Sequence, residues 1–179
     1  MHSMRTTVLL AAALASLMAG TACAGVADSS ANGFTVKIAV YVQAPPAEAY
    51  RKFVRNIGDW WNSSHTFSGS AKNLSIEEKA AGCFCERLPD GGGVRHMEVV
   101  TIMPGKMIVM TGALGPMQSL AAAGNMKVQF SSEEGGTKFE MTYSVVGYLA
   151  TGMNTFAGPS DGMLTEQVTR FKNYVEAGK

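Results

Sequence analysis

The long periodic segment near the end of the chain limits most strongly what this sequence can fold into. Four apolar residues recur at i, i+4, i+7 and i+11, the spacing of one face of a helix: Leu164, Val168, Phe171 and Val175. Ser160 or Asp161 can cap the helix, and Gly178 can end it. We therefore expect an amphipathic helix over residues 160–177, which needs a second layer to cover its apolar face.

Short strands separated by turn signals supply that layer. Residues 34–42 alternate between apolar and polar side chains. A helical stretch then begins at Pro45-Pro46, and a second short helix is expected at Trp60-Trp61. Strand character recurs in six further segments: 73–80, 83–88, 93–102, 106–114, 125–132 and 136–148. The predicted fold is α+β, with a curved antiparallel sheet of about seven strands around the C-terminal helix.

Several segments of the chain also resemble a known superfamily in their order. They are residues 42–54 (VQAPPAEAYRKFV), 59–61 (DWW), 81–92 (AGCFCERLPDGG), 100–106 (VTIMPGK) and 162–172. Together they resemble the START-like, or SRPBCC, helix-grip superfamily, most of all its homologues of the activator of the heat-shock-protein ATPase and its polyketide cyclase/dehydrase-like proteins. The resemblance covers residues 34–177, which we take as a single domain. It implies an apolar cavity between sheet and helix, which some members use for catalysis and many for binding alone.

The first residues are typical of an export signal. Arg5 gives a positive start, residues 6–20 are apolar, and Ala22-Cys23-Ala24 is a small-residue cleavage site, so cleavage is expected after Ala24. A lipidated Cys23 is the alternative, and Gly20 at the third position before it fits poorly. Residues 25–33 are expected to be a mobile lead-in. We predict a periplasmic or secreted protein, which makes a chaperone-ATPase partner unexpected.

Charge argues against nucleic acid as a partner, and hydropathy argues against a membrane-spanning segment after the leader. The chain has 15 Lys and Arg against 14 Asp and Glu and contains no basic run, so nucleic acid is not expected. No segment after the leader is long and apolar enough to span a membrane. A protein partner cannot be named from the sequence.

The stretch GCFCERLPDGGGVRH, residues 82–96, suggests three kinds of site. The glycines at 91–93 lead into a strand and not a helix, which excludes a phosphate-binding loop. A regular strand would place the Cα atoms of Cys83 and Cys85 about 6.5–7 Å apart, at the limit for a disulfide, so unpaired thiols are favoured. Cys-x-Cys is not the spacing of a structural zinc site. We predict no metal and no cofactor.

Titratable residues near this hairpin are candidates for proton transfer. His96 and Glu98 are two residues apart and share a strand face, and the same holds for Phe84 and Glu86. His96, Glu98 and Glu86 are therefore the candidate catalytic residues, with His65 as a further acid or base. Both faces of this strand are partly apolar. The alternative is therefore that these polar residues form a solvated stripe on the outer face of the sheet.

Candidate ligand-binding residues lie on the expected inner face of the sheet, on the tryptophan segment and on the last helix. They are Trp60, Trp61, His65, Phe84, Met110, Phe130, Met141, Tyr143, Leu164, Val168 and Phe171. Ordinary core packing is the alternative. The loops 112–124 and 147–158 are long enough to form a lid.

The sequence leaves three functions open. The first is an exported protein that binds a small hydrophobic or aromatic molecule. The second is a cyclase, dehydratase or hydrolase of the same fold, and the third is a protein-interaction module without a ligand.

Overall fold

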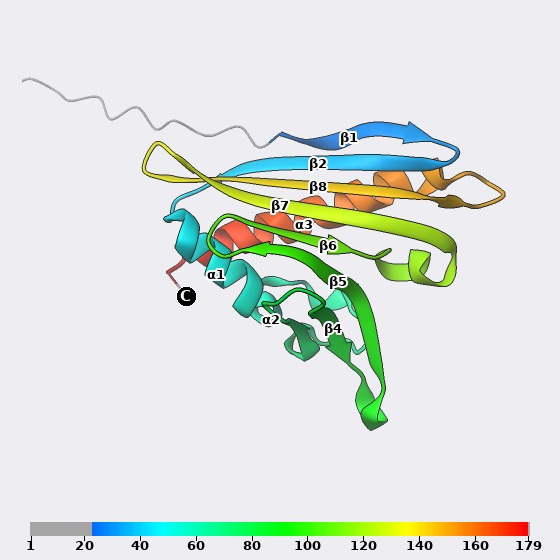
Figure 1. Ribbon diagram of the computed structural model, residues 1–179, viewed down its shortest axis with the longest axis horizontal. Helices are drawn as coiled ribbons and strands as arrows, with labels where there is room; N and C mark the ends of the chain where they lie inside the picture. Colours follow the sequence, from blue (N-terminus) through cyan, green and yellow to red (C-terminus); the bar gives the residue numbers. More distant parts are fainter. Residues whose placement is uncertain (1–22, 179) are drawn as a thin grey trace, which may run out of the picture.

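The computed structural model describes residues 23–178 and contains one antiparallel sheet around a long helix (Figure 1). The strands are β1 (Cys23–Ser30), β2 (Gly33–Val42), β3 (Leu74–Ile76), β4 (Cys83–Arg87), β5 (Gly93–Met103), β6 (Met107–Thr111), β7 (Ala121–Glu133) and β8 (Gly136–Tyr148). The helices are α1 (Pro46–Arg55), α2 (Ile57–Trp60) and α3 (Ala157–Glu176). Short 3₁₀ turns are η1 (Ser63–His65), η2 (Ala71–Asn73), η3 (Pro89–Gly91), η4 (Gly115–Ser119) and η5 (Met153–Phe156).

The strand order in the sheet is β1-β2-β8-β7-β6-β5-β4-β3. The chain therefore starts at one edge, leaves through α1 and α2 to the opposite edge, and returns strand by strand until β8 pairs with β2. The strands curve in front of α3 in the view of Figure 1, so that the helix lies along the concave face of the sheet. The expected α+β sheet around a C-terminal helix is confirmed, with eight strands among the described residues.

The longest hairpin, β7–β8, shows why the alternating pattern specifies one face. Glu133 pairs with Gly136, and the two turn residues between them have positive φ, 41° at Glu134 and 83° at Gly135. Alternate residues along both strands are buried and form the floor of the core: Met126, Val128, Phe130, Phe139, Met141, Tyr143 and Val145.

The apolar face of α3 closes this core. All four residues of the predicted stripe are buried: Leu164, Val168, Phe171 and Val175. The ring of Phe171 lies 5.3 Å from that of Phe53, 5.4 Å from that of Trp60 and 5.2 Å from that of Phe139, measured between centroids. One end of the sheet–helix interior is thus filled by aromatic side chains.

Three boundaries differ from the sequence-based expectation. Helix α3 begins at Ala157 and has no side-chain cap, so Ser160 lies inside the helix and is buried. The second short helix, expected at Trp60-Trp61, is α2 over Ile57–Trp60 and so ends at the start of the expected segment. Strand β3 covers only three residues of the expected segment 73–80.

The structure also differs at residues 25–33, which were expected to be a lead-in outside the domain. Residues from Cys23 to Ser30 form β1, which pairs with β2 at the edge of the sheet. The pattern CAGVADSS gave no strand signal because nearly all of these side chains are exposed. The expected export signal lies outside the described residues, apart from Cys23 and Ala24.

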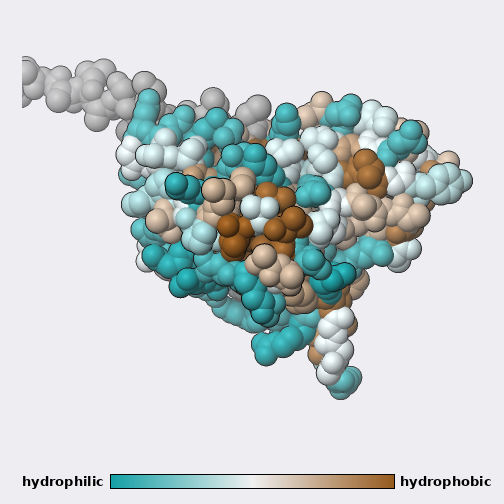
Figure 2. Space-filling view, in the orientation of Figure 1, coloured by the Kyte–Doolittle hydropathy of each residue, from teal (hydrophilic) through white to brown (hydrophobic). Residues whose placement is uncertain are grey.

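The outward surface in Figure 2 is mainly polar, with a small group of hydrophobic residues near its centre. Exposed large apolar side chains include Val100, Met103, Val146 and Tyr148. Within residues 23–178, no helix has the length and apolar character needed to cross a membrane.

Candidate functional site

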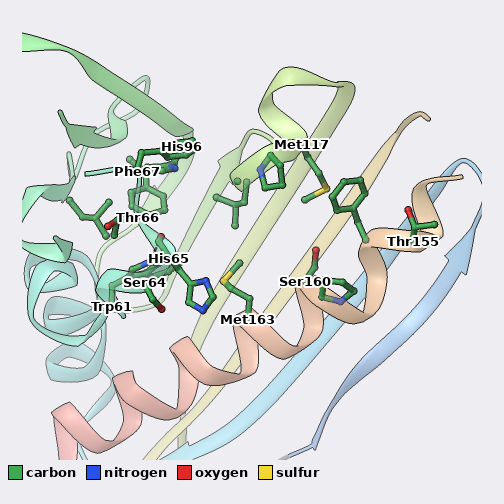
Figure 3. A pocket seen from close by; sticks show the side chains of 17 residues that line it. Trp61, Ser64, His65, Thr66, Phe67, His96, Met117, Thr155, Ser160 and Met163 are labelled. Carbon is green, nitrogen blue, oxygen red and sulfur yellow. Dashed lines mark hydrogen bonds between the residues drawn. The ribbon is translucent and has the colours of Figure 1, made fainter. Parts of the chain in front are cut away.

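A cavity of about 480 Å³ lies at the other end of the sheet–helix interior (Figure 3). Strands β4 and β5 supply Phe84 and His96, and α3 supplies Ser160 and Met163. The segment after α2 adds Trp61 and the residues of η1 and its neighbours. Most lining side chains are apolar, which is the composition of a small-molecule site with few polar contacts.

Both loops expected to form a lid contribute to this cavity. Leu114, Pro116 and Met117 come from residues 112–124, and Thr155 and Phe156 come from residues 147–158. Tyr143 braces the first loop, because its Oη accepts a hydrogen bond from the backbone N–H of Leu114 at 2.8 Å. Whether these loops move on binding stays a prediction.

A β-bulge in β5 places His96 at the cavity. Phe84 and Cys85 of β4 pair with Met97 and Arg95, so His96 is left without a partner in the ladder. A bulge breaks the alternation of strand faces and re-aims a side chain. As a result the adjacent His96 and Met97 are both buried.

The imidazole of His96 forms a buried pair with Glu86. Its Nε2 lies 2.9 Å from Oε2 of Glu86, and the two side chains are 7% and 0% exposed. The backbone N–H of Phe67 donates to the same Oε2 at 3.1 Å, and the backbone N–H of Ser68 donates to Oε1. Hydrogen bonding therefore satisfies both carboxylate oxygens, as burial of a charge requires.

Burial and hydrogen bonding act in opposite directions on this pair. Burial raises the pKa of Glu86, but hydrogen bonds from Ser68, from the Phe67 backbone and from His96 outweigh it and leave the pKa below its ordinary value. Burial lowers the pKa of His96, and the Glu86 carboxylate offsets this only in part. At neutral pH the pair is thus an ionised Glu86 beside a neutral His96.

Two phenyl rings are neighbours of the His96 ring. The ring centroid of Phe84 lies 5.0 Å from that of His96, and the centroid of Phe67 lies 5.9 Å from it. Phe67 is 57% exposed and also lines the cavity. The imidazole therefore has one buried and one exposed phenyl ring as neighbours.

A second imidazole–carboxylate pair lies at the cavity edge. Nε2 of His65 is 3.1 Å from Oε2 of Glu166 on α3, and both side chains are about two-fifths exposed (37% and 42%). Asn62 donates to the other oxygen of Glu166. Hydrogen bonds from Asn62 and then from His65 lower the pKa of Glu166. This pair ties the segment after α2 to α3.

Cys83 and Cys85 form a disulfide, which corrects the expectation of unpaired thiols. Their Cα atoms are 5.3 Å apart, within the ordinary range for a disulfide and shorter than the spacing in a regular strand. The pair lies opposite the bulge at His96, where the ladder is irregular. Phe84, between the two cysteines, points to the opposite face and lines the cavity.

The structure brings together only part of the predicted site. Trp61, His65, Phe84 and His96 line the cavity. Glu86 lies behind His96. The remaining candidates for ligand binding are packed in the core and do not line it: Trp60, Met110, Phe130, Met141, Tyr143, Leu164, Val168 and Phe171.

Glu98 is not paired with His96, contrary to the expectation from their spacing. Its Oε2 is 2.9 Å from Nη1 of Arg95, and its side chain is 41% exposed. The bulge is the reason, because it shifts the two residues out of the regular alternation. The carboxylate that accompanies His96 comes from β4 instead.

Other lining residues were missing from the sequence-based set. They include Thr66, Phe67, Leu114, Met117, Phe156 and Met163. Most lie in irregular segments, where no periodicity marks which side chain faces inward. The length of the two glycine-rich loops was the available signal. No cluster of three potential metal-ligating residues occurs in the part of the chain that the structure describes.

Comparison with known proteins rests on structure. No family model matches the sequence, and no curated protein matches it. A putative uncharacterized protein from Rhizobium leguminosarum superposes with a TM-score of 0.63 at 20% identity, over 81% of this chain and 95% of that one. A conserved protein of unknown function from Enterococcus faecalis gives 0.57 at 14% identity, over 90% and 80%.

A third solved structure, Ara h 8.0201, superposes with a TM-score of 0.56 at 14% identity, over 81% of this chain and 99% of that one. The chain has the helix-grip fold. At these identities the likeness shows the helix-grip arrangement alone, so activity has to be argued from the site.

Proposed function

We propose that this protein binds one small, mainly apolar molecule in the cavity between the sheet and α3, with His96 as a polar contact. The observation that carries this proposal is a cavity of about 480 Å³, walled by apolar side chains, with a buried imidazole in its lining. The volume lies in the range of small-molecule sites. A ligand that buries about 300 Å² of apolar surface gains about 7 kcal/mol, so micromolar dissociation constants are expected.

Native mass spectrometry of the purified protein tests this proposal directly, since a bound molecule would add a discrete mass. A matched pair of variants on α3 locates the site. Ser160→Phe places a ring in the cavity, whereas Thr169→Phe places the same ring on the exposed face of the helix. Loss of binding in Ser160→Phe, with binding kept in Thr169→Phe, is the expected result. Equal affinity in both variants would place the ligand elsewhere.

A second candidate function is proton transfer on the bound molecule, as in cyclases and dehydratases. The observation in its favour is the buried Glu86–His96 pair, in which Glu86 orients an imidazole that lines the cavity. The test follows the recovered ligand by mass spectrometry during incubation with the protein. A catalyst converts it, and His96→Ala should then abolish conversion at saturating ligand while still binding the molecule, about tenfold more weakly. If the wild-type protein leaves the molecule unchanged, the proton-transfer function is contradicted and the binding function stands.

The interaction-module alternative has less support. A module that binds no ligand needs no internal cavity, whereas the structure contains one beside the aromatic core. The hairpin AGCFCERLPDGG supports a place near the polyketide cyclase/dehydrase-like branch of the superfamily, which we propose on motif resemblance alone.

We also propose that the protein is exported. The apolar leader with its small-residue cleavage site supports this proposal, as does the Cys83–Cys85 disulfide, because disulfides persist in oxidising compartments. Cleavage after Ala24 would leave Gly25–Ser30 paired with β2. Fractionation of expressing cells and N-terminal sequencing test the proposal. Mature protein that starts at Met1 would contradict it.

A further inference from the structure

We propose that the ligand class for this cavity is an apolar molecule with a neutral hydroxyl, such as a phenol or an enol, which donates a hydrogen bond to Nδ1 of His96. This inference rests on the proposed function, because it concerns the same cavity. It goes further by stating which polar group the site selects and which groups it rejects.

The hydrogen bonds of Glu86 determine which nitrogen of His96 carries the proton. Both oxygens of Glu86 accept hydrogen bonds from backbone N–H groups, at Ser68 for Oε1 and at Phe67 for Oε2. A proton on either oxygen would compete with these fixed donors, so Glu86 is a carboxylate and can only accept. The nitrogen that lies 2.9 Å from Oε2, Nε2 of His96, must therefore donate.

The other ring nitrogen of His96, Nδ1, is left as a hydrogen-bond acceptor. In a neutral imidazole, one nitrogen carries the proton and the other accepts. With the proton on Nε2, Nδ1 is an acceptor. His96 lines the cavity, and no side chain or backbone group within residues 23–178 hydrogen-bonds to its Nδ1. Burial of the ring favours the neutral form.

An acceptor at Nδ1 distinguishes ligands by whether they can donate a hydrogen bond. A hydroxyl can donate to Nδ1, whereas an ether or a ketone has no proton to donate. A carboxylate would place a second negative charge near Glu86 in apolar surroundings. The hydroxyl of Ser160 also lines the cavity, but it can donate or accept and so imposes no preference. His65 also lines the cavity with its Nε2 on Glu166, but its side chain is 37% exposed against 7% for His96, so water competes for its other ring nitrogen.

Matched probes on two apolar bodies test the inference. The first series is 2-naphthol, 2-methoxynaphthalene and 2-naphthoate, and the second is the corresponding hydroxy-, methoxy- and carboxy-pyrene. Affinities are measured by titration calorimetry with the full chain at pH 7.5. The hydroxyl probe should bind about tenfold more tightly than the methoxy probe, as one hydrogen bond to a buried acceptor implies. The carboxylate should bind most weakly.

Glu86→Gln gives a sharper test, because it should reverse the tautomer. With its amide nitrogen toward His96, Gln would donate to Nε2, and the proton of His96 would move to Nδ1. Because a hydroxyl and a methoxy oxygen can both accept from Nδ1–H, the variant should then bind the two probes about equally. Glu140→Gln is the matched control, since Glu140 is exposed and pairs with Lys138 on β8. It should keep the wild-type preference.

His96→Phe provides a second variant should Glu86→Gln fail to fold. It keeps a planar ring and removes the acceptor, so the hydroxyl probe should lose its tenfold advantage while the methoxy probe binds as before. Equal binding of hydroxyl and methoxy probes to the wild-type protein would overturn the ligand class and leave the binding function standing. Absence of binding by every probe of both series would count against the proposed function itself.

Discussion

Glu86 and His96 lie on neighbouring strands without being partners in the ladder. Glu86 pairs in register with Val94, two residues before His96. The bulge in β5 turns the imidazole back, so that Nε2 comes within 2.9 Å of Oε2 of Glu86. A single irregularity in one strand thus brings a carboxylate, an imidazole and an apolar cavity together.

Removal of the carboxylate should cost much of the folding stability. Glu86→Ala leaves two backbone N–H groups and Nε2 of His96 buried without an acceptor. We expect the free energy of unfolding to fall by about 3 kcal/mol in urea titrations. Glu98→Ala, which removes an exposed carboxylate paired with Arg95, should change it by less than about 1 kcal/mol. Similar losses in both variants would contradict the assignment of Glu86 as the partner of His96.

Stability should decrease as the pH falls from 7.5 to 4. The folded-state pKa of His96 lies below its ordinary value of 6.5, so the unfolded chain takes up a proton first and stability is lost as the pH drops below 6.5. The pKa of Glu86 is also lowered, which adds a loss below its ordinary value of 4.5. Each unit of pKa shift corresponds to about 1.4 kcal/mol.

Urea titrations at each pH measure this dependence. His96→Gln should flatten the curve between pH 6.5 and the lower folded-state pKa and leave the steeper loss at lower pH. The charged group that contacts His96 in the described structure is Glu86, so the two residues should be varied singly and together. An unchanged curve in His96→Gln would assign the pH dependence to other groups.

The disulfide should stabilise the hairpin modestly and shape the cavity more. Closing a loop as short as Cys83–Cys85 is worth about 1.5 kcal/mol in the chain-entropy view, which is what the double Ser variant should lose. Affinity for the hydroxyl probe should fall as well, because Phe84 lies between the cysteines and contacts His96. Thiol alkylation under native conditions is the check, and two reactive thiols in the oxidised protein would refute the pairing.

Tyr143 should control the order of the loop that carries Leu114. Its hydroxyl accepts the Leu114 N–H, and burial raises its pKa to about 12. Tyr143→Phe removes the acceptor at almost constant volume, with an expected loss of about 1–2 kcal/mol. Hydrogen exchange should accelerate in residues 112–119. A uniform acceleration along β7 and β8 would indicate a general loss of stability instead.

The sequence predicted the elements that bury one regular face. Phe171 and its neighbours on α3, and Phe130 and Phe139 on β7 and β8, follow the periods of a helix and a strand. The sequence did not predict strand β1, because its small side chains are exposed and its pairing with β2 produces no alternating apolar pattern. Propensity could not distinguish it from a loop.

The site was harder to predict than the fold. The spacing of His96 and Glu98 suggested that the two residues share a strand face. A β-bulge at His96 breaks this alternation, and the sequence carries no local signal of that bulge. Met110 and Met163 are both apolar, yet one packs in the core and the other lines the cavity. Residue type cannot distinguish these two roles, because each depends on whether the sheet and α3 are in contact or apart at that position.

Phe67 links two properties of this molecule that would otherwise be independent. Its exposed ring lines the cavity beside His96, and its backbone N–H donates to the Glu86 carboxylate at 3.1 Å. An opening of the cavity through displacement of this residue would also remove one hydrogen bond from Glu86. If a molecule enters past this residue, its passage would therefore also change the proton affinity of the buried pair.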